Sequence, residues 1–242
     1  MYLNVDLGEE VRPNLEIEKA VMPYIDACNI ACGGHAGNET TMRESILLAK
    51  MHKVKIGVHP SYPDRSRFGR ASMNITDEKL RISIIHQMHL LQKIAEQEDA
   101  SINHVKLHGA LYNDAAFDKK LATLVVKAVN AFDPNCILFT PPKSILSDIA
   151  NLHKIKVVYE VFGDRNYNDD LSLVNRSYKK ALITNKLDLS LHIRSMLHDQ
   201  KIISAYGKSL AVKMDTICMH SDHDEAVENI KLVSKWIREN KQ

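Results

Sequence analysis

The chain has 242 residues, of which 45% are hydrophobic and 26% charged, and its formal net charge is +2. This composition is typical of a globular protein and excludes disordered, fibrous and strongly basic nucleic-acid-binding classes. Single α/β barrels commonly reach this length, so we expect one domain over residues 1–242.

The first residues show no basic segment followed by an apolar core, which a signal peptide would have. No apolar run approaches the roughly 20 residues that a membrane-spanning helix needs. The four cysteines are scattered, which favours reduced thiols. We therefore expect a cytoplasmic protein whose partners are neither membranes nor nucleic acids.

Short apolar runs alternate with longer helical patterns, which predicts βα units around a parallel sheet. Continuous rather than alternating hydrophobicity is typical of strands that are covered on both faces. The predicted strands are residues 3–7, 27–31, 55–58, 105–107, 136–140, 157–161 and 216–219. Seven strands with short crossovers favour a TIM-like β/α barrel, and an open doubly wound sheet is the alternative.

Apolar residues at three-or-four spacing predict amphipathic helices between the strands. The clearest stripe, within residues 80–95, follows Thr76 as a predicted N-cap. Similar stripes occupy residues 121–132 and 226–237, and we interpret all three as faces packed against the sheet. Residues 162–176 have no periodicity and predict a long loop after the sixth strand, where functional residues are common.

Polar or ionisable residues stand at the ends of the predicted strands, where the chain turns toward the next helix. In parallel α/β folds the loops at these carboxyl ends build the binding site. Buried polar groups cost free energy unless they pair or bind something, so we predict that they share one pocket. These residues are Asn4, Asp6, Asn29, His35, His59, Asp64, Lys106, His108, Glu160, His220 and Asp222.

Other motifs give little support to competing chemistries. Gly207-Lys208-Ser209 resembles the end of a phosphate-binding loop, but Ile202 stands where that loop needs glycine. Cys28 and Cys32 lack a second close ligand pair, so the spacing predicts buried thiols rather than zinc. No Gly-x-Ser-x-Gly elbow supports a serine nucleophile. These spacings assign no protein-bound metal, and a metal site stays open.

Longer motifs surround the strand ends and follow one another over nearly the whole chain. They are Asn4-Val-Asp6-Leu-Gly8-Glu9, Asn29-Ile-Ala-Cys32-Gly-Gly-His35-Ala-Gly37, His59-Pro-Ser-Tyr-Pro-Asp64 with Phe68-Gly69-Arg70, His104-Val-Lys106-Leu-His108, Glu160-Val-Phe-Gly-Asp164-Arg165, Val174-Asn-Arg176 and Cys218-Met-His220-Ser-Asp222. In these motifs the sequence resembles the LamB/YcsF family, whose members are the A-type components of bacterial 5-oxoprolinases.

The resemblance implies a distorted seven-stranded barrel of the glycoside hydrolase/deacetylase kind. It also implies hydrolysis of 5-oxo-L-proline to L-glutamate with cleavage of ATP to ADP and phosphate. ATP, accompanied by Mg²⁺, would be the co-substrate, and 5-oxoprolinase subunits B and C would be the partners; a homo-oligomer stays open. The alternative functions are a metal-dependent deacetylase or amidase and a non-catalytic, substrate-binding scaffold subunit.

Opening a lactam requires a proton acceptor and cations that offset developing negative charge. The residues expected to be catalytic supply carboxylates, imidazoles and an ammonium group, and they are Asp6, His59, Lys106, His108, Glu160 and His220. The residues expected to bind substrate supply amides, guanidinium groups and further polar groups, and they are Asn4, Asn29, His35, Asp64, Arg165, Arg176 and Asp222.

Overall fold

The computed structural model describes residues 1–9 and 15–240. Within these ranges, parallel strands close into a barrel in the order β1-β2-β3-β4-β5-β6-β9, and β9 pairs with β1 to complete the ring. The strands are β1 Tyr2–Leu7, β2 Ala27–Ala31, β3 Lys55–His59, β4 Ile102–Lys106, β5 Ile137–Thr140, β6 Lys156–Phe162 and β9 Thr216–Met219. The predicted barrel is confirmed, and the open sheet is wrong.

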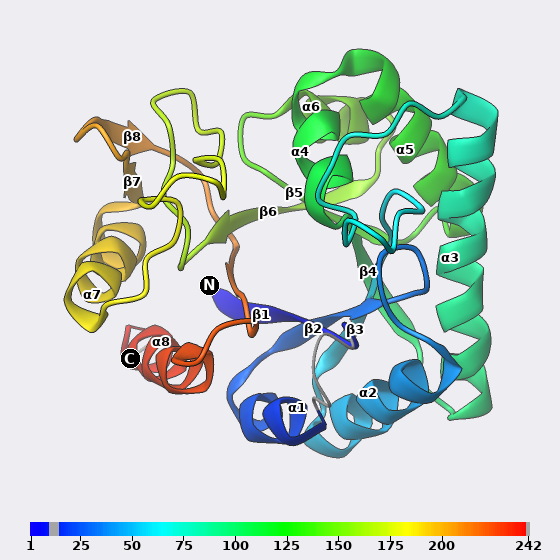
Figure 1. Ribbon diagram of the computed structural model, residues 1–242, viewed down its shortest axis with the longest axis horizontal. Helices are drawn as coiled ribbons and strands as arrows, with labels where there is room; N and C mark the ends of the chain where they lie inside the picture. Colours follow the sequence, from blue (N-terminus) through cyan, green and yellow to red (C-terminus); the bar gives the residue numbers. More distant parts are fainter. Residues whose placement is uncertain (10–14, 241–242) are drawn as a thin grey trace.

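Helices surround the strands on the outside of the barrel (Figure 1). They are α1 Leu15–Val21, α2 Glu39–His52, α3 Asp77–Gln97, α4 Gly109–Phe117, α5 Lys119–Phe132, α6 Ile145–Leu152, α7 Lys186–Arg194 and α8 Ala226–Glu239, with single turns η1 Met22–Tyr24 and η2 Ser195–Asp199. The predicted stripe of α3, from Leu80 to Ala95, is buried, as is that of α8. Thr76 occupies the N-cap position of α3, although its side chain makes no capping hydrogen bond.

The strand bounds agree with the predicted ranges to within one residue, except for β4. The prediction began that strand at Val105, whereas the structure begins it at Ile102. Asn103 and His104 interrupt the apolar run, yet His104 is fully buried inside the barrel. A buried polar residue thus hid the first half of the strand from a hydrophobicity pattern.

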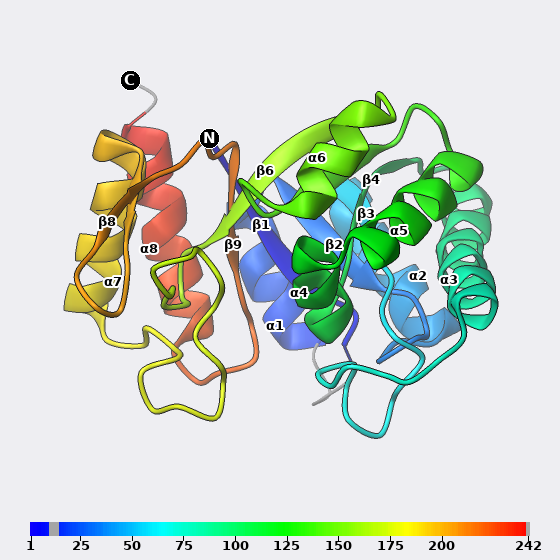
Figure 2. The ribbon, with the colours of Figure 1, turned by 90° about the horizontal axis from the view of Figure 1, so that it is seen from above.

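The connection from β6 to α7 is the long loop that the sequence predicted, although Phe162 itself belongs to β6. Isolated bridges join Arg165 to Leu182 and Tyr167 to Leu173 and fold the loop back on itself. The antiparallel pair β7 Lys201–Ile203 and β8 Ser209–Ala211, which was not predicted, lies beside α7 (Figure 2). Among the described residues, no helix has both the length and the apolar character needed to cross a bilayer.

Candidate active site

A cavity of about 320 Å³ lies at the carboxyl ends of the barrel strands. Its lining includes Asp6 from β1, Lys106 from β4 and Glu160 from β6, together with His220, which directly follows β9. These residues are far apart in the sequence, and the closure of the barrel brings them together. This end of a β/α barrel is where binding sites are generally found, and the volume suits a small molecule.

The floor of the cavity is a buried ammonium group between two carboxylates. Lys106 Nζ donates to Asp6 Oδ1 at 2.7 Å and to Cys218 Sγ at 2.9 Å, and it lies 3.3 Å from Glu160 Oε1. Burial lowers the pKa of Lys106, but Asp6, Cys218 and Glu160 together outweigh this effect and hold the pKa well above the usual range. Burial raises the pKa of Glu160, which suits this carboxyl to carrying a proton.

A chain of buried amides holds Asp6 from below. Asn29 Nδ2 donates to Asp6 Oδ1 and to Asn4 Oδ1, both at 2.8 Å, and Asn4 Nδ2 donates to Thr216 Oγ1 at 2.9 Å. His104 Nε2 donates to Asn29 Oδ1 at 2.8 Å. Asn4 and Asn29 are fully buried beneath the cavity. Their bonds position the Asp6 carboxylate, and substrate contact by these two amides stays a prediction.

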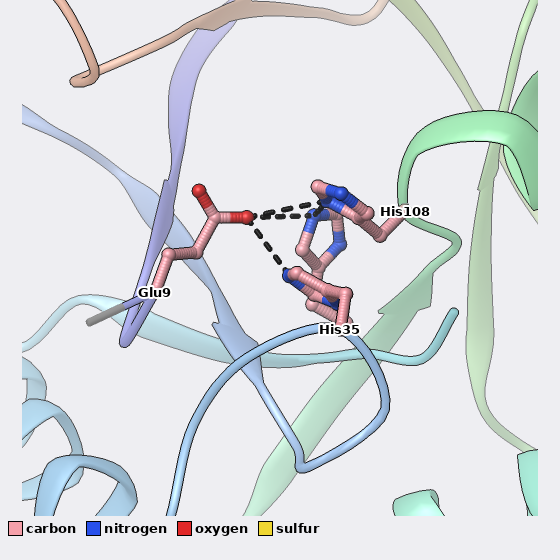
Figure 3. A group of neighbouring side chains, drawn as sticks. Glu9, His35 and His108 are labelled. Carbon is pink, nitrogen blue, oxygen red and sulfur yellow. Dashed lines mark hydrogen bonds and ion pairs between the residues drawn. The ribbon is translucent and has the colours of Figure 1, made fainter. Parts of the chain in front are cut away.

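Beside Asp6, three histidines gather around Glu9 (Figure 3). His59 Nε2 lies 3.3 Å from Asp6 Oδ2 and 3.0 Å from His108 Nδ1. Glu9 Oε1 lies 3.0 Å from His35 Nε2 and 3.2 Å from His108 Nδ1. Burial alone would raise the pKa of Glu9, but the neighbouring His108 and His35 hold it well below the usual range.

His220, directly after β9, is oriented by a buried carboxylate from the loop after β6. Its Nδ1 lies 2.9 Å from Asp164 Oδ1, and its backbone N–H donates to Asp164 Oδ2 at 2.7 Å. Burial alone would raise the pKa of Asp164, but the neighbouring His220 brings it down to about 2, so Asp164 is ionised. An ionised carboxylate requires the Nδ1–H tautomer, which leaves Nε2 as the basic nitrogen of His220.

Guanidinium groups line the outer part of the cavity. Arg176 Nη1 and Arg70 Nη2 both donate to Asp222 Oδ2, at 3.2 Å and 2.8 Å. Arg165 is buried and donates from Nη2 to the carbonyl of Val174 at 2.7 Å. Burial lowers the pKa of Arg165 to about 10, with Arg176 adding to the effect. These cations suit an anionic ligand.

Five predicted site residues do not line the cavity, namely Asn4, Asn29, His35, Asp64 and Asp222. Of these, Asp64 is bound within its own turn. It lies in the connection from β3 to α3, where its carboxylate accepts from Arg67 Nε at 2.6 Å and from Ser66 Oγ at 2.7 Å. It is absent from the cavity lining. The contacts of Asp64 are those of a local turn, and its expected role in substrate binding stays untested.

The structure adds residues to which the sequence assigned no role. Glu9, Arg70 and Tyr112 line the cavity, and Asp164 orients a lining histidine. The sequence did indicate that His104 faces the same way as Lys106. It precedes Lys106 by two residues, so both side chains lie on one face of β4. No comparable signal fixed Glu9 or Asp164, because their roles depend on how separate loops meet.

Together these groups provide general acid–base chemistry beside a fixed positive charge. Glu160 has a raised pKa, His220 presents a basic nitrogen, and Lys106 is a cation held at the floor. Such a combination can protonate a leaving nitrogen, accept a proton from water and offset an oxyanion.

Comparisons with known proteins agree with this architecture. The family model described as LamB/YcsF family matches residues 1–242. A Pyrococcus horikoshii protein, named as the A component of 5-oxoprolinase, is 41% identical over 238 residues, which cover 98% of this chain and 93% of that protein. A Pyrococcus abyssi protein of the same name is 40% identical, with the same coverage. The crystal structure of a lactam utilization protein from Thermus thermophilus matches with a TM-score of 0.86 at 31% identity, covering 99% of this chain and 95% of that one.

Proposed function

This chain belongs to the LamB/YcsF family, and from that premise we propose that it is the A component of an ATP-dependent 5-oxoprolinase. The reaction would hydrolyse 5-oxo-L-proline to L-glutamate with cleavage of ATP to ADP and phosphate. Subunits B and C would complete the enzyme. The proposal rests chiefly on the convergence of Asp6, Lys106, Glu160 and His220 on one cavity, together with the names of the relatives.

The proposed substrate carries a carboxylate on a small lactam ring. The guanidinium groups of Arg165 and Arg176, which line the cavity, would bind that carboxylate in bidentate fashion. Lys106 Nζ would lie toward the lactam oxygen and offset the negative charge of the phosphoryl group transferred to that oxygen. Asp6, ionised beside it, would keep Lys106 in place.

Two groups would move protons during ring opening. His220 Nε2 would accept a proton from the attacking water, because Asp164 fixes the proton of the ring on Nδ1. Glu160, with its raised pKa, would give a proton to the lactam nitrogen as the carbon–nitrogen bond breaks. The two residues would exchange their protons with solvent before the next turnover.

ATP would phosphorylate the lactam oxygen and leave as ADP. Attack of water on the ring carbon and cleavage of the carbon–nitrogen bond would then give an acyl phosphate, which a second water would hydrolyse to glutamate and phosphate. The negative charge of ATP fits other cations of the cavity lining, among them Arg70 and Lys143. These side chains would hold the phosphates in the absence of a phosphate-binding loop motif in the sequence. Mg²⁺ would accompany the nucleotide.

The direct test is reconstitution with subunits B and C, measuring glutamate and phosphate released from 5-oxo-L-proline. We expect equal amounts of both products, only with ATP and all three subunits present. The Glu160→Gln complex should assemble but be inactive, whereas Glu96→Gln, on the exposed face of α3, should be fully active. An active Glu160→Gln complex would favour the scaffold alternative, and glutamate release without ATP would favour the metal-dependent amidase.

A further inference from the structure

We propose that Glu9, His59 and His108 form a binding site for a divalent first-row transition-metal ion such as Zn²⁺, with His35 positioning Glu9. This inference goes beyond the proposed function, because the mechanism proposed above assigns no metal ion to these residues. Metal binding can also be measured without turnover. The spacing of residues in the sequence predicts no such site, because the three ligands come from three separate segments.

Hydrogen bonds to backbone carbonyls fix which nitrogen of two rings faces inward. His59 Nδ1 lies 2.8 Å from the carbonyl oxygen of Lys106, and His108 Nε2 lies 3.0 Å from that of Phe68. A carbonyl only accepts, so both of these nitrogens carry a proton. The other nitrogen of each neutral ring then presents a lone pair. Metal-ligating histidines are commonly oriented by this kind of bond to a carbonyl.

The two lone pairs are directed toward one another. His59 Nε2 and His108 Nδ1 are 3.0 Å apart, and neither can donate to the other when both rings are neutral. Two carboxylate oxygens add negative charge, because Glu9 Oε1 is 3.2 Å from His108 Nδ1 and Asp6 Oδ2 is 3.3 Å from His59 Nε2. One proton on His59 Nε2 would be a single donor facing several acceptors. A divalent cation would satisfy them together.

The spacing of the ligand atoms matches a small transition-metal ion. Atoms bound at about 2.0–2.1 Å to a tetrahedral zinc ion lie roughly 3.3–3.4 Å from each other. The three spacings here are 3.0 Å between the two nitrogens, and 3.2 Å and 3.9 Å from Glu9 Oε1 to His108 Nδ1 and His59 Nε2. Imidazole ligands favour Zn²⁺ and its neighbours over Mg²⁺, which prefers oxygen.

His35 lies within the same group, but its orientation gives it a different role (Figure 3). Its ring is stacked on that of His108, with centroids 3.5 Å apart and an angle of 3° between the planes. Two parallel rings at this spacing cannot both direct an in-plane lone pair at one ion. His35 Nε2, 3.0 Å from Glu9 Oε1, instead donates to the carboxylate and holds it toward the ion.

The ion would be accessible from the cavity. Glu9, His59 and His108 all line it, whereas His35 does not. The three protein ligands leave a coordination position for water or a substrate oxygen, as in zinc sites that keep an open position.

The experiment is a titration of the full-length protein, stripped with a chelator, with Zn²⁺, Mn²⁺ and Mg²⁺ by calorimetry. We expect one Zn²⁺ per chain, with Mg²⁺ unable to compete. His59→Gln and His108→Gln should each weaken Zn²⁺ binding by more than about 100-fold, and His35→Ala by about 10–100-fold, as for other residues that orient ligands. His86→Ala, on the exposed face of α3, is the matched control and should bind as the wild type does.

Co²⁺ provides a readout that needs no variant, because its visible d–d bands report nitrogen and oxygen coordination. If the wild-type protein binds neither Zn²⁺ nor Co²⁺, the proposal is wrong. A proton shared between His59 Nε2 and His108 Nδ1 would then occupy the site. Zn²⁺ binding that survives in folded His59→Gln and His108→Gln proteins would also overturn the proposal. Neither result bears on the proposed 5-oxoprolinase function, which the reconstitution assay tests separately.

Discussion

Lys106 and Asp6 form a buried ion pair, with Nζ 2.7 Å from Oδ1, across 100 residues of sequence. Removing one member of such a pair leaves the other charge buried, which typically costs about 3–5 kcal/mol. We therefore expect Lys106→Met to lower the free energy of unfolding by about 3 kcal/mol, measured by urea denaturation.

A double variant separates this electrostatic cost from lost packing. Lys106→Met with Asp6→Asn should be destabilised by less than the sum of the single changes, because no uncompensated Asp6 charge is left. Lys127→Met, on an exposed face of α5, is the control and should change stability by no more than about 0.5 kcal/mol. Additive effects of Lys106→Met and Asp6→Asn would contradict the pairing.

Asp164 should matter for turnover because it fixes the tautomer of His220. An asparagine could donate to Nδ1 and place the ring proton on Nε2, which would remove the base. We expect Asp164→Asn to reduce kcat of the reconstituted enzyme by about 10²–10⁴, the usual contribution of general acid–base catalysis. His220→Ala should cost a similar factor, and the double variant little more. Multiplicative losses would show that the two residues act independently.

The sequence predicted the barrel strands well, because continuous apolar runs mark strands that are covered on both faces. It also grouped Asp6, His59, Lys106, Glu160 and His220 at strand ends, and the structure arranges all five around one cavity. That grouping followed from topology, since the carboxyl ends of parallel strands meet at one end of a barrel.

Side-chain direction within loops could not be predicted in the same way. Asp64 was expected in the pocket because of its position after the third strand, yet its carboxylate turns back to Arg67 and Ser66. Glu9 lies beyond the end of β1 and meets histidines from three other segments. Such contacts depend on how loops pack, which hydrophobic periodicity does not encode.

Asp222 joins two loops at the mouth of the cavity by accepting from both Arg70 and Arg176. Partly exposed ion pairs contribute at most about 1 kcal/mol to stability, so Asp222→Asn should barely change the unfolding transition. It should raise KM for 5-oxo-L-proline several-fold with little change in kcat, because the guanidinium groups lose their common anchor. Asp77→Asn, which breaks an exposed ion pair with Lys120, is the control. A lower KM would instead mean that Asp222 competes with substrate for the arginines.

Gly57 leaves room for the His104 ring across the β3–β4 pair. A Cβ at position 57 would stand 2.1 Å from His104 Nε2, the atom that donates to Asn29. Gly57→Ala should therefore lower the free energy of unfolding by about 3 kcal/mol, as overpacking of a core does. Adding His104→Ala should restore part of that loss by emptying the space. Gly207→Ala is the control, because its Cβ would meet nothing within 4 Å. It should lower the free energy of unfolding only by the roughly 1–2 kcal/mol that a left-handed backbone costs a residue with a Cβ. A similarly small loss for Gly57→Ala would refute the clash with His104.

Stability should depend on pH through His192, a residue of α7 that is buried against the end of β6. Burial lowers the pKa of His192 to about 4 from its ordinary 6.5. Between these values the unfolded chain binds a proton that the folded chain does not, so stability rises with pH. This contribution, up to about 3 kcal/mol, is complete above pH 6.5 and is lost as the pH falls through 4. His192→Leu should flatten the dependence of unfolding free energy on pH in that window, whereas His198→Leu, at an exposed position, should leave it unchanged. Equal slopes for wild type and His192→Leu would show that His192 takes up its proton in the folded protein as readily as in the unfolded chain.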